Sequence, residues 1–143
     1  MLIQVASESL RGMPASHRTT SGLEWITDEP QAMGGDNTGP NPLEAVLGAW
    51  AGCLVIVTRM VAAENGWTVG TVTTDTRGEF DPRGFMGHPG VSPYFSEAAA
   101  VLSVQGATDA QLVTLGQAVE ARCPVSGLLK AAGIATRVTL QHG

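Results

Sequence analysis

An apolar helical segment over residues 42–65 restricts the fold of this chain more than any other feature. Asn41 is a candidate N-cap, Pro42 suits the first helical position, and Glu44 stands where a carboxylate completes a capping box. Gly66 ends the segment. Because apolar side chains occur on almost every side of this helix, we expect it to be buried on most sides.

Strands and shorter helices make up the rest of the chain. Alternating apolar residues and turn residues predict the strands, and capping or breaking residues predict the helices. We predict strands over 2–7, 18–27, 67–80, 91–105 and 134–140, helices from Thr108 to a break at Cys123-Pro124 and over 125–132, and loops over 28–41 and 81–90. The order β-β-α-β-β-α-α-β favours an α+β fold with antiparallel sheet over a doubly wound parallel sheet.

The composition is typical of a globular protein, which we expect to form one domain over 1–143. Hydrophobic residues make up 43% of the chain and charged residues 15%, enough to bury a core. A net charge of −5 argues against nucleic-acid binding, which needs a basic surface. The N-terminus lacks a signal-peptide pattern, and charged residues interrupt the apolar segment before about 18 apolar residues follow one another. We therefore expect a cytoplasmic protein that binds no membrane.

Two cysteines, Cys53 and Cys123, are the candidate chemical groups. They are 70 residues apart, too far for a redox Cys-x-x-Cys motif, so only the fold can bring them together. If they meet, they suit a peroxidatic and a resolving thiol; if they do not, they are two small buried hydrophobic residues. A thiol reacts as its thiolate, so a reactive Cys53 needs a cation from elsewhere in the fold. The candidate cations are Arg11, Arg18, Arg77, Arg83, Arg122 and His17.

Glu44 and Cys123 each have two interpretations. Glu44 precedes Cys53 by nine residues, half a turn out of phase and about 13 Å along the helix, so a joint role needs a bridging residue or a second copy of the chain. Its alternative role is the helix cap. Cys123 precedes Pro124, and a cysteine that starts a helix gains thiolate stabilisation from exposed N–H groups. Its alternative role is a buried residue at the end of the preceding helix.

The remaining candidate residues indicate no cofactor. The histidines lie in predicted loops or near a terminus, without metal-ligand spacing: His17, His88 and His142. The stretch GGDNTG (34–39) lacks the lysine of a phosphate-binding loop. We expect the three tryptophans to be core residues: Trp25, Trp50 and Trp67.

The stretch GGDNTGPNPLEAVLGAWAGC (34–53), followed by ARCPVS (121–126), resembles the OsmC/Ohr family of thiol-dependent peroxidases. DPRGFMG (81–87) is similar to a loop of the YhfA-like branch, and the resemblance covers nearly the whole chain. It implies an α+β OsmC-like fold in which antiparallel sheets wrap around the central helices of an intertwined homodimer.

The resemblance also implies a mechanism. Cys53 would be the peroxidatic thiol that attacks an organic hydroperoxide and becomes a sulfenic acid, and Cys123 would condense with it to a disulfide. An external dithiol reductant would restore the pair, with no metal, haem or flavin. The alternative is a non-enzymatic protein on the same fold that senses redox state or binds an apolar ligand. A third interpretation is a purely structural domain.

The family pattern adds an arginine and a carboxylate to the two thiols. The arginine comes from the N-terminal hairpin, where Arg18 is the best positional match, with Arg83 as the alternative. In the organic hydroperoxide resistance branch, a carboxylate ten residues before the first cysteine holds this arginine. Here that position is Leu43, and the acid is Glu44, one helical step of about 100° away. The implied catalytic residues are Cys53, Cys123, Arg18 and Glu44.

Overall fold

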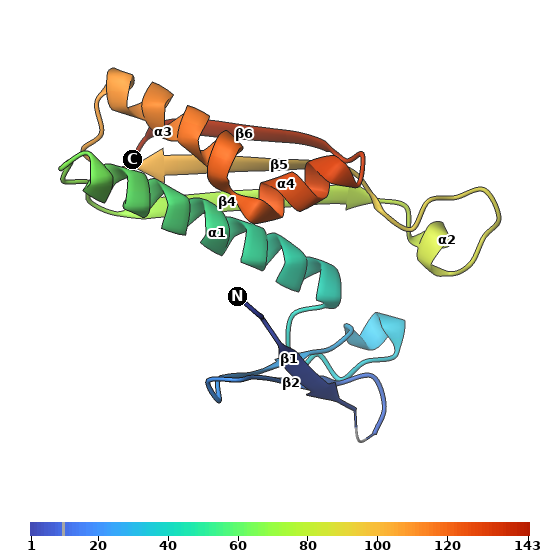
Figure 1. The fold of residues 1–143 in the computed structure, drawn as a ribbon. Helices are drawn as coiled ribbons and strands as arrows, with labels where there is room; N and C mark the ends of the chain where they lie inside the picture. Colours follow the sequence, from blue (N-terminus) through green and yellow to red (C-terminus); the bar gives the residue numbers. More distant parts are fainter. Residues whose placement is uncertain (10) are drawn as a thin grey trace. The chain divides into compact units, whose positions relative to one another are not determined.

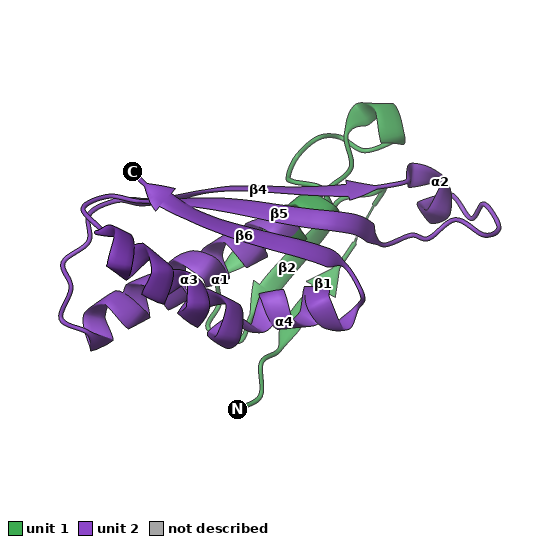
Figure 2. Cartoon of the chain, turned by 90° about the horizontal axis from the view of Figure 1, so that it is seen from above, with its two compact units in different colours: residues 1–46 green, residues 47–143 purple. Residues whose placement is uncertain are grey.

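The computed structural model describes residues 1–9 and 11–143, which form two compact units (Figure 2). The first unit is Met1–Val46 and the second is Leu47–Gly143. Helix α1 (Pro42–Glu64) begins in the first unit and continues through the second. The single domain expected over 1–143 stays a prediction.

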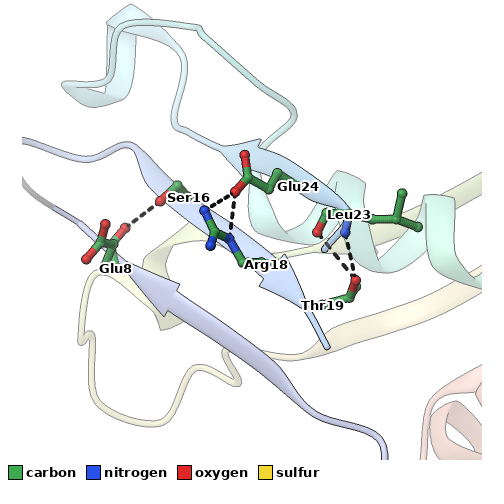
Figure 3. Close-up of polar contacts among 6 residues, drawn as sticks. All are labelled: Glu8, Ser16, Arg18, Thr19, Leu23 and Glu24. Atoms are coloured by element: carbon green, nitrogen blue, oxygen red, sulfur yellow. Dashed lines mark hydrogen bonds and ion pairs between the residues drawn. The ribbon is translucent and has the colours of Figure 1, made fainter. Parts of the chain in front are cut away.

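The first unit contains a three-stranded antiparallel sheet. Its strands, in order across the sheet, are β1 (Val5–Glu8), β2 (Ala15–Thr19) and β3 (Glu24–Thr27). The prediction of one strand over 18–27 is wrong, because a turn divides it. The Thr19 hydroxyl accepts the Leu23 N–H at 3.0 Å (Figure 3), and Gly22 adopts a φ of 87° in the left-handed region. A threonine that bonds the nearby backbone favours a turn over a continuing strand.

Asp28 organises the segment between β3 and α1. Its side chain is 2% exposed, and its Oδ1 accepts the Glu29 N–H at 2.8 Å. Its Oδ2 accepts the Asp36 N–H at 3.0 Å and both the N–H and the hydroxyl of Thr38 at 2.9 Å. The predicted loop over 28–41 contains only one short 3-10 helix, η1 (Gln31–Met33), before α1 begins. One buried carboxylate therefore satisfies donors from both ends of this loop.

Replacing Asp28 with asparagine is expected to destabilise the protein more near neutral pH than in acid. The Thr38 N–H is the largest cause of the lowered pKa of Asp28, and together with the other hydrogen bonds it outweighs burial, which raises that pKa. A lowered folded pKa stabilises the protein above the unfolded pKa of about 3.9, and this stabilisation is lost as the pH falls through the folded value. Urea unfolding near neutral pH and at about pH 3 measures the effect.

Asp36→Asn is the matched control for that experiment. Asp36 lies in the same loop and its side chain is exposed, so its substitution is expected to change stability little at either pH. Equal losses in the two variants, or a loss in Asp28→Asn that persists unchanged in acid, would contradict the role of the Asp28 charge.

The second unit contains the other three-stranded sheet. Its strands, in order across the sheet, are β4 (Val72–Phe80), β5 (Phe95–Val104) and β6 (Ala135–His142). Strands β4 and β5 are antiparallel, as predicted, but β5 and β6 are parallel. A parallel pair needs a crossover connection, which the helical segment between β5 and β6 supplies. The predicted α+β class is confirmed, whereas the antiparallel pairing holds for only one of these two strand pairs.

Helices cover one face of this sheet (Figure 1). The covering helices are α1, α3 (Asp109–Arg122) and α4 (Pro124–Ala131). Thr108 opens α3 through the predicted capping box with Gln111. The core between helices and sheet includes these fully buried side chains: Trp50, Leu54, Leu102, Val104, Leu115 and Val119. The predicted loop over 81–90 contains the short helix α2 (Pro82–Phe85).

Helix α1 is buried along one stripe rather than on most sides, so that prediction is wrong for the single chain. Its buried residues are Trp50, Leu54, Val57, Thr58, Val61 and Ala62. On the helix surface, Ile56 is 60% exposed and Met60 is 48% exposed. By length and composition alone α1 could cross a membrane, with a mean hydropathy of 1.9, but a core helix passes the same test. The exposed part of α1 is therefore an apolar surface that the described residues leave uncovered.

Candidate functional site: a pair of thiols

The fold brings the two cysteines together. The Sγ atoms of Cys53 and Cys123 lie 3.0 Å apart and share a hydrogen bond, and both cysteines are free. Cys53 comes from the middle of α1, and Cys123 lies where α3 ends and α4 begins. Cys123 is 3% exposed, whereas Cys53 is half-buried. Of the two sulfur atoms, Cys53 is therefore the one that a reactant from solvent can approach.

Cys123 is at once the last, capping residue of α3 and the N-cap of α4, the two positions that its sequence context allows. Its N–H bonds the Val119 carbonyl at 3.1 Å, which makes it the C-cap of α3. Its sulfur accepts the Ser126 N–H at 3.4 Å, which makes it the N-cap of α4, with Pro124 next at the first helical position. The sulfur therefore faces N–H groups at the positive end of a helix, which favour a thiolate.

The surroundings change the pKa of the two thiols in opposite directions. Burial is the largest cause of the raised pKa of Cys53, and the hydrogen bond with Cys123 raises it further, against a lowering by the Val125 backbone. Burial also raises the pKa of Cys123, but hydrogen bonds from Cys53, from Ser126 and from the Val125 backbone together outweigh it and lower that pKa. The Cys123 sulfur, at the start of α4, thus accepts hydrogen bonds that favour its thiolate, whereas burial of Cys53 disfavours a thiolate there.

Trp50 contributes more than the core packing that the sequence predicts for it. It is fully buried, and its Nε1–H donates to the Ser126 hydroxyl oxygen at 2.8 Å. Ser126 is 1% exposed and belongs to the same helix turn as Cys123. A buried tryptophan needs an acceptor for its N–H, so a tryptophan in the core indicates that a hydrogen-bond acceptor lies next to it. Nothing in the sequence identifies that partner as Ser126, 76 residues away.

A hollow of about 450 Å³ opens beside Cys53, within the second unit. Its lining is mostly apolar: Ala49, Gly52, Ile56, Val57, Met60 and Pro124, with Cys53 and Arg122. The Arg122 guanidinium is bound to Glu64 by hydrogen bonds of 2.6 and 2.8 Å, and this contact lowers the pKa of Glu64. Arg122 is thus the candidate cation that shares a hollow with Cys53, and its charge is already paired.

Arg18 and Glu44 lie in the first unit, each with a local partner. Arg18 in β2 donates from Nε to the Glu24 carboxylate of β3 at 2.6 Å (Figure 3). Glu44 accepts the Asn41 N–H at 2.8 Å, and Asn41 accepts the Glu44 N–H at 2.9 Å. This reciprocal contact is the predicted cap of α1. The catalytic roles of Arg18 and Glu44 stay predictions.

The alternative arginine, Arg83, also has a local partner. Asp81, the N-cap of α2, accepts hydrogen bonds from the Arg83 backbone N–H and from its Nε at 3.0 Å. The side-chain bond lowers the pKa of Asp81 and raises that of Arg83, and the backbone bond lowers the pKa of Asp81 further. A role for Arg83 at a thiol would require this exposed pair to open.

His17 and Trp25 differ from their predicted positions. His17 lies in β2 rather than in a loop, and its ring bonds the hydroxyls of Ser7 and Thr27 at 2.8 Å each. Trp25 stacks on His17 with ring centroids 4.9 Å apart and is 40% exposed, so its prediction as a core residue is wrong. Across residues 1–9 and 11–143, no cluster of three His, Cys, Asp or Glu side chains is arranged to hold a metal ion.

A family model described as OsmC-like protein matches residues 35–139 of the chain. The chain belongs to the OsmC-like family. The match includes both cysteines, Trp50 and Ser126. A comparison with curated proteins gives no match.

Solved structures of OsmC-like proteins share this fold. An OsmC-like protein of unknown function from Vibrio cholerae gives a TM-score of 0.81 at 12% identity, covering 99% of each chain. The organic hydroperoxide resistance protein OsmC from Legionella pneumophila gives 0.70 at 16% identity, covering 99% of this chain and 97% of that chain. The organic hydroperoxide resistance protein OhrB of Bacillus subtilis gives a TM-score of 0.67 at 16% identity, covering 99% of this chain and 98% of that chain. At such identities the likeness shows the fold alone.

Proposed function

We propose that this OsmC-like protein is a cysteine-based peroxidase that reduces organic hydroperoxides in defence against oxidative stress. The observation that carries the proposal is the pair of free thiols, with sulfur atoms 3.0 Å apart. A disulfide has an S–S distance of about 2.05 Å, so the two sulfur atoms need to approach by only about 1 Å. Structural relatives named as organic hydroperoxide resistance proteins, such as those from Legionella pneumophila and Bacillus subtilis, support the same class of activity.

The proposed reaction has two steps that leave the protein oxidised. The Cys53 thiolate attacks the terminal oxygen of the hydroperoxide, the O–O bond breaks, and the alkoxide takes up a proton and leaves as the alcohol. The Cys123 thiolate then attacks the sulfur of the Cys53 sulfenic acid, and hydroxide leaves to become water. An external dithiol returns two electrons and reopens the disulfide.

The hollow beside Cys53 favours an apolar substrate. Alkyl side chains such as those of Ile56 and Met60 offer contact to a hydrocarbon tail and no hydrogen bonds to a small polar peroxide. Fatty or aromatic hydroperoxides are therefore the proposed substrates, in preference to hydrogen peroxide. The two thiols supply the redox chemistry, so the proposal includes no cofactor besides the external dithiol.

A homodimer is proposed to complete the site. Burial raises the pKa of Cys53, so a cation beside it would favour the thiolate that the first step needs. Arg18 is proposed for that role, with Arg83 as the alternative and Glu44 as the carboxylate that holds the arginine. The exposed apolar surface of α1 supports a second copy of the chain as partner. A cytoplasmic location is part of the same proposal.

Replacing Ile56 with arginine is expected to shift the dimer to monomer by at least about tenfold in dissociation constant. A charged side chain at the centre of an apolar interface is left without a partner when two chains associate. Sedimentation of the reduced protein over a range of concentrations measures the change. Val113→Arg is the matched control, because Val113 is an apolar residue on α3 that is 62% exposed, against 60% for Ile56. A monomeric parent protein, or equal effects of the two substitutions, would contradict a dimer interface on α1.

Intact mass and free-thiol count test the peroxidase proposal. The reduced protein is measured before and after one equivalent of cumene hydroperoxide, with hydrogen peroxide in parallel. Loss of two hydrogen atoms and of both thiols, faster with cumene hydroperoxide, is the expected result. Retention of both thiols with either oxidant would refute it.

One observation favours a second candidate function, a non-enzymatic redox sensor or apolar-ligand carrier on the same fold. The raised pKa keeps Cys53 protonated near neutral pH in the single chain, and a protonated thiol is a poor nucleophile. This candidate predicts that an apolar ligand binds in the hollow without being consumed. It also predicts that Cys53 resists alkylation near neutral pH, whereas the peroxidase requires it to react.

A further inference from the structure

The side chains that line the hollow beside Cys53 change in size along α1. Before Cys53, α1 contributes Ala49 and Gly52 to the lining, and after it the contributions include Ile56 and Met60. At 1.5 Å per residue, this lining runs about 16 Å along the helix. The smallest side chains therefore lie at the end of the hollow that precedes Cys53, and the longest lie at the end that follows it.

The sulfur of Cys53 belongs to the end with the small side chains. In a helix the Cα–Cβ bond points toward the N-terminus, so a side chain covers the turn before its own Cα. For Cys53 that turn contains Ala49 and Gly52. Pro124 of α4 lines the same hollow from the other helix. A hydroperoxide whose terminal oxygen reaches this sulfur therefore places its oxygen-bearing carbon close to the two small residues.

Nothing in the described part of the chain accounts for a glycine at position 52. Gly52 lies within α1, and its φ is not among the positive values that favour glycine. A Cβ atom placed on it would contact nothing within 4 Å apart from its chain neighbours and the backbone of its own helix. Alanine would therefore fit and would favour the helix more than glycine does. The space that the missing side chain leaves belongs to the hollow beside Cys53.

We propose that Gly52 is a specificity-determining residue that admits hydroperoxides with bulky groups on the carbon that bears the peroxide. Tertiary and aryl-substituted hydroperoxides, such as cumene hydroperoxide, form this class, because their carbon substituents need space directly beside the sulfur. Unbranched hydroperoxides have two hydrogen atoms on that carbon and need this space far less. The inference rests on the proposed peroxidase function and specifies the substrate class of the same site.

Gly48 provides the means to separate a ligand from a second copy of the chain as the reason for the open space. A Cβ atom on Gly48 would also contact nothing within 4 Å beyond its chain neighbours and its own helix backbone, but Gly48 does not line the hollow. At 100° per residue it lies about 140° around α1 from Cys53, against about 100° for Gly52. Close packing of another chain on this side of α1 would involve both glycines, whereas a ligand beside the sulfur involves Gly52.

Three variants test the role of Gly52. Gly52→Ala adds one methyl group to the wall of the hollow, Gly52→Leu adds a longer side chain, and Gly48→Ala is the matched control. Both alanine variants are expected to melt at a higher temperature than the parent protein, because alanine is the better helix former. A loss of activity in Gly52→Ala therefore does not arise from loss of folding.

Three measurements apply to each variant. The first is kcat/KM, in the presence of excess dithiol, for cumene hydroperoxide, unbranched hexyl hydroperoxide and hydrogen peroxide. The second is the affinity of the reduced protein for cumyl alcohol and for 1-hexanol, which are not consumed, by NMR titration. The third is sedimentation, which reports any change in association between copies of the chain.

The substitutions of Gly52 are expected to discriminate between hydroperoxides by their shape. Gly52→Ala lowers kcat/KM for cumene hydroperoxide by about five- to tenfold, and Gly52→Leu lowers it by at least about thirtyfold, because the added atoms occupy space beside the sulfur. The value for hydrogen peroxide changes by less than about twofold, and that for hexyl hydroperoxide falls less than that for cumene hydroperoxide. Affinity for cumyl alcohol falls in the same order. Gly48→Ala leaves all of these values unchanged.

An unchanged ratio of kcat/KM for cumene and hexyl hydroperoxides in both Gly52 variants would overturn the inference. Equal effects of Gly48→Ala and Gly52→Ala, or a shift from dimer to monomer that accounts for the loss, would overturn it in favour of contact with a second copy. If the parent protein consumes no hydroperoxide, the peroxidase function fails, and alcohol binding decides the role of Gly52. Weaker binding of cumyl alcohol to Gly52→Leu then supports a space for bulky groups, and equal binding refutes it.

Discussion

Turnover of cumene hydroperoxide falls by about a thousandfold or more when Cys53 is replaced with serine, which is the largest effect that we expect on activity. A serine hydroxyl is not ionised near neutral pH, so the nucleophile of the first step is lost. The partly exposed position of Cys53 tolerates the slightly smaller side chain, so the variant is expected to fold. Consumption of the hydroperoxide in the presence of excess dithiol measures the loss.

The free thiol of Cys123 provides the internal control for this variant. Cys53→Ser still contains Cys123, so any residual reaction with peroxide reports the reactivity of a buried thiolate rather than that of Cys53. We expect this reaction to be slow, because Cys123 is only 3% exposed. Turnover that persists in Cys53→Ser at the parent rate would rule out Cys53 as the peroxidatic residue.

Cys123→Ser is expected to reduce one equivalent of hydroperoxide and then stall, with steady turnover at least about a hundredfold lower. The first step uses Cys53 alone, so a sulfenic acid forms on Cys53 and finds no thiolate to close the disulfide. The variant is expected to fold well, because Cys123 is the N-cap of α4 and serine is a preferred N-cap residue. Rapid mixing with one equivalent of hydroperoxide, followed by dimedone trapping and intact mass, measures the stalled species.

The outcome of this second experiment also bears on the proton between the two sulfur atoms. Replacing Cys123 removes the hydrogen bond that raises the pKa of Cys53. Oxidation of Cys53 in Cys123→Ser is therefore expected to be at least as fast as in the parent protein. Continued turnover with dithiol at the parent rate, or no sulfenic acid after one equivalent of hydroperoxide, would show that Cys123 is not the resolving thiol.

Local features of the sequence predicted the helices well. The start of α1 follows from Asn41, Pro42 and Glu44, and the start of α3 follows from Thr108, because a cap involves residues only three positions apart. The division of the predicted strand over 18–27 was missed. The turn depends on a hydrogen bond from the Leu23 N–H to the Thr19 hydroxyl. The same residues also suit a continuous strand, so local sequence preference does not decide between a strand and a turn.

Burial could not be read from residue type alone. Trp25 and Trp50 are the same residue, yet one is 40% exposed beside His17 and the other is fully buried. The apolar character of α1 predicted a helix surrounded by protein, but the described part of the chain buries one side of it. Hydrophobic side chains indicate surfaces that favour burial, and which of those surfaces another element covers depends on the packing of the whole fold.

By itself, the sequence determined the α+β class, the ends of the main helices and the presence of two thiols in a family-specific context. Only the tertiary structure decided that the Cys53 and Cys123 sulfur atoms lie 3.0 Å apart and that Trp50 bonds Ser126 beside them. These contacts join residues 70 and 76 positions apart. Interactions within one turn are encoded by neighbouring residues, whereas contacts between helices arise only when the core packs and sets the distance between their backbones.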